Sequence, residues 1–364
     1  MAERRDVVVL GAGFVGASVA GALAGRGARV VVLDADRAGG LGSRAAAGVA
    51  VPSLRLAADP VLLEFVRAGK RRLDAEVAEL ERGGAGVRRG SGVLRIALRD
   101  GQRDELERTA AGAGMDLGRW LDPGALAEAE PLLAGGPAQG GFLDPGGYLV
   151  DVAGYLGALA GAAARAGAEL RLGTAATRVA AGADGVTVGT DAGDVRCDTV
   201  VVAAGAWSSR LPGLGVPGVR PLRGQALTLA PSSGDLRHVV SSYLGYLAPA
   251  ADGVLVGATE EDAGYAADVT AAGLLHLTSA AARVAPRLRD ARFLRAWAGL
   301  RAVTASGRPV IGRVPGCPRA IVASGHGGQG VLTAGLTAAA VVELVERGAS
   351  DVAAPFDPAR MGER

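Results

Sequence analysis

Cysteine, aromatic residues and excess charge are all scarce in this chain. Its two cysteines, Cys197 and Cys317, lie far apart and belong to no C-x-x-C or Cys/His cluster, which argues against a disulfide framework and a zinc site. Aromatic residues make up only 4%, too few for surfaces that stack on single-stranded nucleic acid. Lys and Arg total 39 against 37 Asp and Glu, without a basic patch, so we expect no nucleic-acid partner. So few cysteines fit a reducing cytoplasm, which is the expected location.

Length and composition indicate an ordinary globular protein with many glycines. At about 150 residues per domain, 364 residues predict two domains. Apolar residues make up 49% and charged residues 21%, which excludes a disordered or fibrous chain. Glycine contributes 58 residues, more than twice the average share of about 7%. Since no collagen-like period is present, we expect these glycines in turns and at close backbone approaches.

Two segments imitate membrane signals. Residues 1–27 combine a charged start with an apolar run, as a secretory signal does, but Asp6 and the regularly spaced glycines favour a strand, a turn and a helix. Residues 320–342 contain no charged side chain and are long enough to span a bilayer. The glycine-rich stretch at 324–330 would leave backbone polar groups unpaired in lipid. We therefore expect a strand, a turn and a helix there too, and no membrane segment.

The first fifty residues predict a dinucleotide-binding unit. The apolar run Asp6–Leu10 is typical of a strand buried on both faces. It leads into G-A-G-F-V-G, which matches the G-x-G-x-x-G motif. Gly11 permits a tight turn, Gly13 lets the backbone approach a pyrophosphate, and Gly16 lets the following helix pack close to the strand. The helix N-terminus then faces negative charge.

A second predicted strand, Arg29–Leu33, completes this unit. It ends at Asp34, whose carboxylate can accept hydrogen bonds from ribose hydroxyl groups. Together, the two strands, the glycine turn and the acid predict a bound dinucleotide. The unit alone does not separate NAD from FAD, because both carry the same adenosine diphosphate portion.

Later segments carry a family resemblance that separates the two cofactors. Residues 40–48 read G-L-G-S-R-A-A-A-G, residues 200–208 read V-V-V-A-A-G-A-W-S, and residues 222–225 read L-R-G-Q. These resemble segments of the D-amino acid oxidase family of FAD enzymes. Within that family the chain is most similar to the glycine oxidases, with matching segments at Tyr246–Pro249, Gly257–Thr259, Trp297–Arg301 and Gly325-His326. The resemblance covers nearly the whole chain.

The resemblance implies an α/β fold with two domains. One is a Rossmann-type, glutathione reductase-like FAD-binding domain, and the other is an antiparallel-sheet substrate domain like that of D-amino acid oxidase. Flavin-contacting segments fall near the start, around residue 200 and near the end, so we expect a discontinuous FAD-binding domain made of 1–80, 146–218 and 298–364. The substrate-binding domain would comprise 81–145 and 219–297.

Periodicity locates several further elements. Helices are predicted at Val61–Glu81, Asp151–Gly167 and Leu332–Glu346. Strands are predicted at 169–172, 185–188 and 320–324. Alternating and apolar runs between Leu222 and Trp297 predict an antiparallel sheet, which would form the wall over the flavin.

Noncovalent FAD is the expected cofactor. Some related sarcosine oxidases attach their flavin to a cysteine, but the surroundings of Cys317 do not resemble that attachment site. His326 is expected to be a neutral residue that braces its loop rather than a base. The residues expected to bind FAD are Gly11, Gly13, Phe14, Val15, Gly16, Asp34, Ala35, Gly42, Ser43, Arg44, Ala46, Ala47, Gly48, Val179, Ala204, Gly205, Trp207, Arg301, Gly325, His326, Gly327, Gly328, Gln329 and Gly330.

Three residues are candidates for substrate contact and catalysis. Arg301 can bind a substrate carboxylate through two parallel charge-assisted hydrogen bonds, the part that the family resemblance also implies for it. Tyr246 resembles a tyrosine that lines the amino acid pocket, or it packs with its hydroxyl at the rim. Glu260 occupies a position where glycine oxidases commonly have an apolar side chain. It either selects a cationic or larger polar substrate or points to solvent, and we favour the latter.

Together, these residues predict an FAD-dependent oxidase of a small amino acid or amine, with dioxygen as the acceptor. Glycine oxidases often carry an arginine where this chain has Gly327-Gly328-Gln329, so the substrate stays open. A dehydrogenase with another acceptor, a biosynthetic oxidase of an unusual amino acid or aminophosphonate, and a noncatalytic flavoprotein subunit are the alternatives. A homo-oligomer is also left open.

Overall fold

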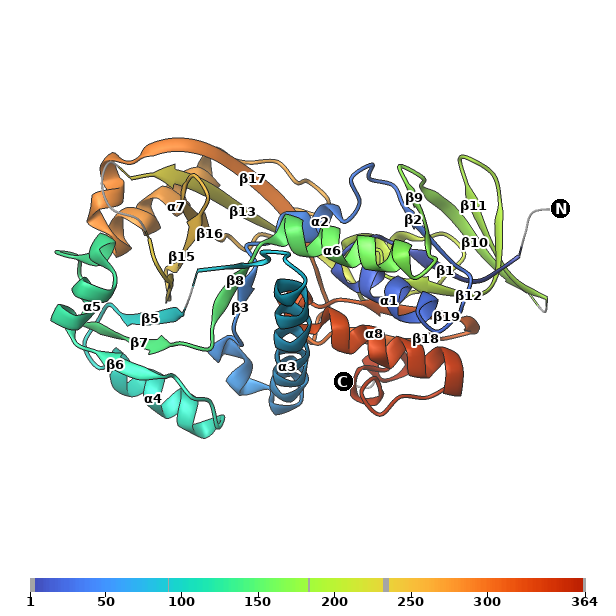
Figure 1. The fold of residues 1–364 in the computed structure, drawn as a ribbon, viewed down its shortest axis with the longest axis horizontal. Helices are drawn as coiled ribbons and strands as arrows, with labels where there is room; N and C mark the ends of the chain where they lie inside the picture. The colour runs from blue at the N-terminus through green and yellow to red at the C-terminus, as the bar shows by residue number, and fades with distance from the viewer. Residues whose placement is uncertain (1–3, 91, 183, 232–235, 363–364) are drawn as a thin grey trace.

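Two large sheets and a group of packed helices make up the computed structural model, which describes residues 4–90, 92–182, 184–231 and 236–362. Residues 1–3 of the segment that imitates a secretory signal lie outside the described residues. In Figure 1 the first sheet and helices α1, α6 and α8 lie at the right, the second sheet lies at the left, and α3 stands between them.

The first sheet joins strands from three distant parts of the chain. Its strands run in the order β10-β11-β12-β1-β2-β9, with β19 paired to both β12 and β18. The central pairs are parallel, and β10, β11 and β18 add antiparallel pairs. The bounds are β1 Arg5–Leu10, β2 Val30–Asp34, β9 Glu169–Leu172, β10 Ala176–Gly182, β11 Gly185–Thr190, β12 Val195–Val202, β18 Val310–Val314 and β19 Cys317–Ser324.

Both faces of β1 are buried, as its unbroken apolar run predicts. Val7 and Val9 pack into one core, and Val8 and Leu10 pack into another on the opposite face. Helix α1 (Phe14–Ala24) covers the first of these cores, packed against α6 (Val152–Arg165) and α8 (Gly330–Arg347). Helix α3 (Pro60–Arg82) packs against α8 in turn. The helices predicted from periodicity are therefore confirmed, with ends shifted by one or two residues.

The second sheet is mixed rather than purely antiparallel. Its strands run β17-β13-β16-β15-β14-β5-β7-β6, and every pair is antiparallel except β5 with β14. The exception arises because two separate chain segments meet at that pair, so no hairpin turn sets their relative direction. The bounds are β5 Val93–Ala97, β6 Arg119–Leu121, β7 Gly140–Asp144, β13 Arg220–Ala230, β14 Val239–Ser242, β15 Gly245–Ala250, β16 Gly253–Gly257 and β17 Arg292–Val303.

Smaller elements connect the two sheets. A three-stranded sheet contains β3 (Val49–Ala50), β8 (Tyr148–Val150) and β4 (Arg88–Arg89). The remaining α-helices are α2 Leu41–Arg44, α4 Gln102–Gly112, α5 Pro123–Ala129 and α7 Ala271–Val284. The 3₁₀ helices are η1 Leu54–Ala58, η2 Pro131–Leu133, η3 Gly205–Arg210, η4 Pro286–Asp290, η5 Ala354–Phe356 and η6 Pro358–Gly362. No helix in the described part of the chain combines the length and the apolar character needed to cross a bilayer.

The long strands β13 and β17 bear on the expected domain boundaries. They pair along their whole length, from Arg220 with Val303 to Ala230 with Arg292. The boundary expected between residues 297 and 298 therefore falls inside an unbroken strand. The C-terminal end of β17 carries Arg301.

Candidate active site

A cavity of about 1010 Å³ has walls from both large sheets. Its volume lies at the upper end of the range of about 300–1,000 Å³ that is usual for small-molecule sites. One wall comes from the glycine turn after β1, the loop at 40–56, the segment after β12 and the turn before α8. The other comes from β5, β13, β14, β15 and β17. The cavity therefore brings together the distant segments in which the sequence predicted contacts.

The glycine turn after β1 leaves no space for side chains. Gly11 has a φ of +106°, and a Cβ atom there would lie 2.4 Å from the Ala203 carbonyl oxygen. At Gly16 a Cβ would lie 1.9 Å from the Gly11 carbonyl oxygen, so α1 can pack against the turn only without one. Gly13 lines the cavity and precedes α1 with no side-chain cap. The turn thus presents bare backbone and a helix N-terminus to the cavity.

Ser43 and Asp34 fix the backbone around this turn. The Phe14 N–H donates to Ser43 Oγ at 3.1 Å. Asp34 accepts three backbone N–H groups, from Ala12 at 2.7 Å, Asp36 at 2.8 Å and Gly40 at 3.1 Å. An ionised carboxylate has about four acceptor positions, so one remains for a ribose hydroxyl. Asp34 also lines the cavity, where such a contact requires it.

Most of the residues expected to bind the cofactor line this cavity, but three do not. Gly16 lies within the first turn of α1, against the Gly11 carbonyl, in its predicted packing role. Arg44 pairs with Asp36, with an N–O distance of 2.7 Å. Val179 is buried in β10. The residues that do line the cavity are Gly11, Gly13, Phe14, Val15, Asp34, Ala35, Gly42, Ser43, Ala46, Ala47, Gly48, Ala204, Gly205, Trp207, Arg301, Gly325, His326, Gly327, Gly328, Gln329 and Gly330.

Val179 fails to reach the cavity for a local reason. Its N–H donates to the Pro212 carbonyl at 2.9 Å, and its side chain packs into the core on the far face of the first sheet. Ala175 and Ala176, at the start of β10, reach the cavity wall instead. Val179 itself therefore does not line the cavity.

His326 is buried beside the cavity. Its Nε2 atom lies 3.0 Å from Thr337 Oγ1, on the first half of α8. Burial lowers the pKa of His326 to about 4, so the ring is neutral near pH 7. A neutral ring bonded to α8 matches the bracing role expected for this residue.

The second sheet turns a row of side chains toward the cavity. Ala226, Gly257, Tyr246, Ser241 and Arg95 are in-register neighbours on successive strands, so their side-chain directions share one face. Four of them line the cavity, and Gly257 lies beneath Tyr246. A Cβ at Gly257 would lie 2.3 Å from the Tyr246 hydroxyl oxygen. Glycine at this position is what lets the tyrosine lie flat against the sheet.

Arg301 enters the same cavity from β17. Its Nη1 donates to the Thr259 carbonyl at 3.0 Å, and its guanidinium lies over Gly224, where a Cβ would be 2.1 Å from Nη1. Burial raises the pKa of Tyr246, and the positive charge of Arg301 opposes that rise. The sheet therefore brings together Arg301, which was predicted to bind a substrate carboxylate, and Tyr246, which resembles a tyrosine that lines the amino acid pocket.

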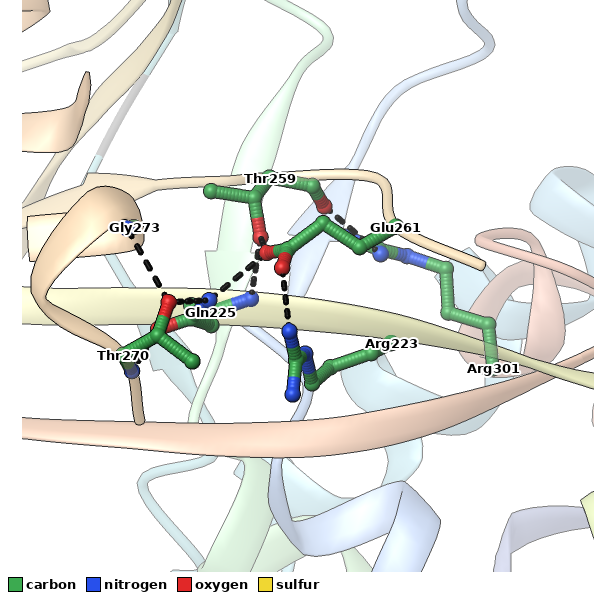
Figure 2. Close-up of polar contacts among 7 residues, drawn as sticks. All are labelled: Arg223, Gln225, Thr259, Glu261, Thr270, Gly273 and Arg301. Atoms are coloured by element: carbon green, nitrogen blue, oxygen red, sulfur yellow. Dashed lines mark hydrogen bonds and ion pairs between the residues drawn. The ribbon is translucent and has the colours of Figure 1, made fainter. Parts of the chain in front are cut away.

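Arg301 has no acidic partner among the described residues. In Figure 2, Glu261 pairs with Arg223 rather than with Arg301. The N–O distance of that pair is 2.5 Å. Since Arg301 is bonded only to a neutral carbonyl, its charge is available for an anion in the cavity.

Glu260 lies at the exposed rim of the cavity. Its side chain is 55% exposed and lies 3.3 Å from Arg55 Nη1, whose side chain is 78% exposed. Such an exposed pair adds little stability, about 0–1 kcal/mol. Both residues line the cavity, so the pair stands where a ligand would enter.

Sequence reasoning missed four basic residues on the cavity wall, which are Arg55, Arg95, Arg99 and Arg210. Arg95, on β5, is buried and pairs with Asp144 at 3.2 Å, and Arg55 lies on η1. Neither belongs to a motif, and only the pairing of β5 with β14 brings Arg95 beside Ser241. Neither Cys197 nor Cys317 lines the cavity. No group of His, Cys, Asp or Glu within the described residues is arranged to hold a metal ion.

Comparison with known proteins identifies the family. Residues 6–344 match the family model described as FAD dependent oxidoreductase. The chain is 31% identical over 358 residues to the glycine oxidase of Geobacillus kaustophilus (strain HTA426), an alignment covering 95% of this chain and 94% of that protein. The chain belongs to this family of FAD-dependent oxidoreductases. The resemblance predicted from the sequence is thereby confirmed, as is FAD as the cofactor.

Solved structures agree. The crystal structure of the Geobacillus kaustophilus glycine oxidase matches with a TM-score of 0.86 at 30% identity, covering 97% of this chain and 98% of that chain. The iminodiacetate oxidase of Chelativorans sp. BNC1 matches with a TM-score of 0.87 at 27% identity over the same shares. The predicted Rossmann-type FAD-binding fold is confirmed.

The cavity fits FAD on the evidence of its own walls. The side-chain-free turn at Gly11 and Gly13 leaves room for a pyrophosphate, and the open N-terminus of α1 favours its negative charge. Gly328 and Gly330, at the turn that leads into α8, line the same cavity. A Cβ at either of these two glycines would meet no atom within 4 Å, which leaves free space next to the backbone.

Replacing Gly13 by valine should weaken FAD binding by at least about tenfold, because the added Cβ would lie 2.8 Å from Ser43 Oγ, the atom that accepts the Phe14 N–H, and would displace the backbone at the α1 N-terminus. Gly21→Ala on the same helix is the control, since its Cβ would meet Ala163 at an ordinary 3.6 Å. FAD released per chain on denaturation measures the outcome. Full FAD content in Gly13→Val would contradict the placement of the pyrophosphate.

Stability should fall as the pH drops from 6.5 to 4. Between these values an unfolded chain protonates His326 while the folded protein keeps it neutral, so the unfolded state binds the extra proton. Through His326, the free energy of unfolding should be about 2 kcal/mol lower at pH 5 than at pH 7. Urea unfolding of wild type and His326→Gln at pH 7 and at pH 5 measures this loss of stability. Equal losses in the two proteins would contradict the effect.

Proposed function

We propose that this FAD-dependent oxidoreductase oxidises the C–N bond of a small amino acid or amine of the glycine, sarcosine or D-amino acid type. The product would be an imine that water hydrolyses to the oxo acid, with dioxygen reduced to hydrogen peroxide. The observation that carries the proposal is the Arg301 guanidinium, which faces the cavity beside Tyr246 without an acidic partner among the described residues.

The proposed chemistry needs little from the protein beyond position. Bound FAD supplies the acceptor for the hydride that leaves the carbon next to the substrate nitrogen. Arg301 would hold the substrate carboxylate through paired hydrogen bonds, and Tyr246 would add its hydroxyl to the same group. Fixing the carboxylate fixes the neighbouring C–H bond, which is the requirement for a near-attack geometry. No protein nucleophile is required.

The names of two relatives are consistent with an acidic amine as substrate. One is a glycine oxidase and the other an iminodiacetate oxidase. The carboxylate of either substrate is a group that a free guanidinium can bind. We extend to this chain the general class, a small amine that carries a carboxylate.

A larger or more acidic substrate is the second candidate, as in an oxidase of an unusual amino acid or aminophosphonate. Arg55 and Arg95 favour it, because both line the cavity in addition to Arg301. Each already has an acidic partner, Glu260 and Asp144 respectively, so a second anionic group would compete with a carboxylate. For that reason the smaller substrate is the primary proposal.

The function is tested by mixing the FAD-loaded protein with amines in the absence of oxygen. Glycine, sarcosine, D-alanine, iminodiacetate and aminomethylphosphonate form the panel, with methylamine as the amine that lacks an acidic group. We expect an amino acid to bleach the flavin absorbance, and admitted oxygen to restore it with release of peroxide. Restoration only by an artificial acceptor would indicate a dehydrogenase. Bleaching by no amine would overturn the proposal and favour a noncatalytic flavoprotein.

Arg301→Ala should raise KM for the amino acid by roughly 100-fold, since it removes a charge-assisted pair of hydrogen bonds. The flavin should stay bound and its spectrum should change little. Arg301→Lys is the matched variant, because lysine keeps the positive charge but lacks the two parallel N–H donors of the guanidinium. We expect its KM to lie between those of wild type and Arg301→Ala. Steady-state kinetics measures both. Wild-type kinetics in Arg301→Ala would remove Arg301 from the role.

A further inference from the structure

The placement of Arg301 depends on the loop that follows β16. Its side chain has one hydrogen bond within the described residues, to the carbonyl oxygen of Thr259 at 3.0 Å. That carbonyl belongs to a loop rather than to a strand, since β16 ends at Gly257. A loop carbonyl is a poor anchor unless other contacts hold it. What holds Thr259 therefore determines where the guanidinium lies.

Gln225 and Glu261 together provide that hold. The Thr259 N–H donates to the Gln225 carbonyl at 3.2 Å, and the Gln225 N–H donates to Thr259 Oγ1 at 2.8 Å. Glu261 adds the side-chain contacts that Figure 2 shows. Its Oε1 accepts the Thr259 hydroxyl at 2.5 Å and the Gln225 side-chain amide at 2.7 Å. Its Oε2 accepts Arg223 Nη2 at 2.5 Å. Backbone bonds of 2.9 Å in both directions between Arg223 and Glu261 attach the loop to β13. One carboxylate thus joins the loop to two residues of the strand beneath Arg301.

Gln225 extends the network to helix α7. Its Oε1 accepts the Thr270 N–H at 2.8 Å, and its Nε2 donates to Thr270 Oγ1 at 3.0 Å. Thr270 in turn caps α7 by accepting the Gly273 N–H at 3.1 Å. A Cβ at Gly273 would lie 2.3 Å from the Gln225 amide nitrogen, so this contact requires glycine. The network is therefore tied to a regular element of fourteen residues as well as to the sheet.

Glu261 also balances the charge of Arg223. The Arg223 side chain is only 11% exposed, and its Nε has no hydrogen-bond partner in the part of the chain that the structure describes. Burial opposes ionisation of Glu261, but hydrogen bonds from Thr259, Arg223 and Gln225 outweigh it and hold the pKa of its carboxyl below the ordinary value. Arg223 is adjacent to Gly224, over which Arg301 lies. With Glu261 ionised, Arg301 is left as the cation without an acidic partner at this point of the described structure.

We propose that Glu261 is a positioning residue for the substrate carboxylate, which acts by fixing the Thr259 carbonyl that holds Arg301. This rests on the proposed function, in which Arg301 binds that carboxylate. Glu261 does not line the cavity itself, whereas its neighbour Glu260 does. The role therefore belongs to a residue that touches neither the substrate nor the cofactor.

The first experiment compares Glu261→Ala and Glu261→Gln in the FAD-loaded protein. Loss of the carboxylate removes the side-chain bonds that fix Thr259, while the backbone bonds of the loop to Arg223 and Gln225 remain. Glu261→Ala should therefore raise KM for glycine by about tenfold and change kcat less than about threefold. Glutamine keeps the oxygen that accepts Thr259 and Gln225, so Glu261→Gln should restore most of the wild-type KM. Asp262→Asn is the matched control. Asp262 is the next residue and pairs with Arg220 of β13, and neither of these two residues lines the cavity.

The second experiment is a double-mutant cycle with Arg301. If Glu261 acts through Arg301, Glu261→Ala should have little further effect on KM once Arg301 is alanine. If Glu261 only supported the fold, the increases in KM caused by Glu261→Ala and by Arg301→Ala would multiply in the double variant. Unchanged KM in Glu261→Ala, or multiplied effects in the double variant, would overturn the proposal. If Glu261→Ala does not fold, Glu261→Asp, whose shorter side chain withdraws the carboxylate from Thr259, is crossed with Arg301→Ala instead, with the same criterion.

Binding of glycolate, the hydroxy-acid analogue of glycine, separates this proposal from the proposed function. Calorimetric titration of the FAD-loaded protein needs no turnover, and the Glu261→Ala variant should bind glycolate about tenfold more weakly than wild type. A wild-type protein that binds glycolate but oxidises no amino acid would refute the proposed function, and the variants would still decide the role of Glu261. A wild-type protein that binds no glycolate and oxidises no amino acid would overturn both.

Discussion

The constraint on which this site depends is a guanidinium inside the cavity that has no acidic partner among the residues that the structure describes. An unpaired cation loses hydration there, and the fold tolerates it only where a partner can arrive from outside. The second sheet meets this condition through three features. Gly224 leaves space beneath Arg301, Thr259 offers a neutral acceptor, and Glu261 is already bonded to Arg223. If a nearby carboxylate turned toward Arg301, the positive charge of Arg301 would be paired within the protein and could no longer bind an anion from outside.

The cofactor half of the site could be predicted from the sequence because its requirements are local. At Gly11 a Cβ atom would lie only 2.4 Å from the Ala203 carbonyl oxygen, so the turn admits only glycine. Such a requirement leaves a glycine in the sequence that can be recognised there. The unbroken apolar run before it reflects burial on both faces of β1. Arg301 could be proposed because it follows a recognisable segment. Its lack of an acidic partner could not be predicted.

The rest depends on pairings between distant segments, which residue patterns do not show. The parallel pairing of β5 with β14 brings Arg95 to the cavity wall, and the bonding of Val179 to Pro212 removes that valine from it. Glu260 and Glu261 are adjacent and chemically identical, so no pattern could tell which one faces the cavity and which one holds the loop. Their roles separate only because β16 ends at Gly257 and the loop then bonds to β13.

The interleaved order of the first sheet has a consequence for protein engineering. Strand β1 lies between β2, which follows it closely along the chain, and β12, which is contributed almost two hundred residues later. A fragment ending before β12 would leave β1 with an exposed apolar edge, a template for aggregation. The nucleotide-binding part therefore cannot be excised as a contiguous module for grafting. Dividing this protein into two complementing pieces would require both to be present during folding.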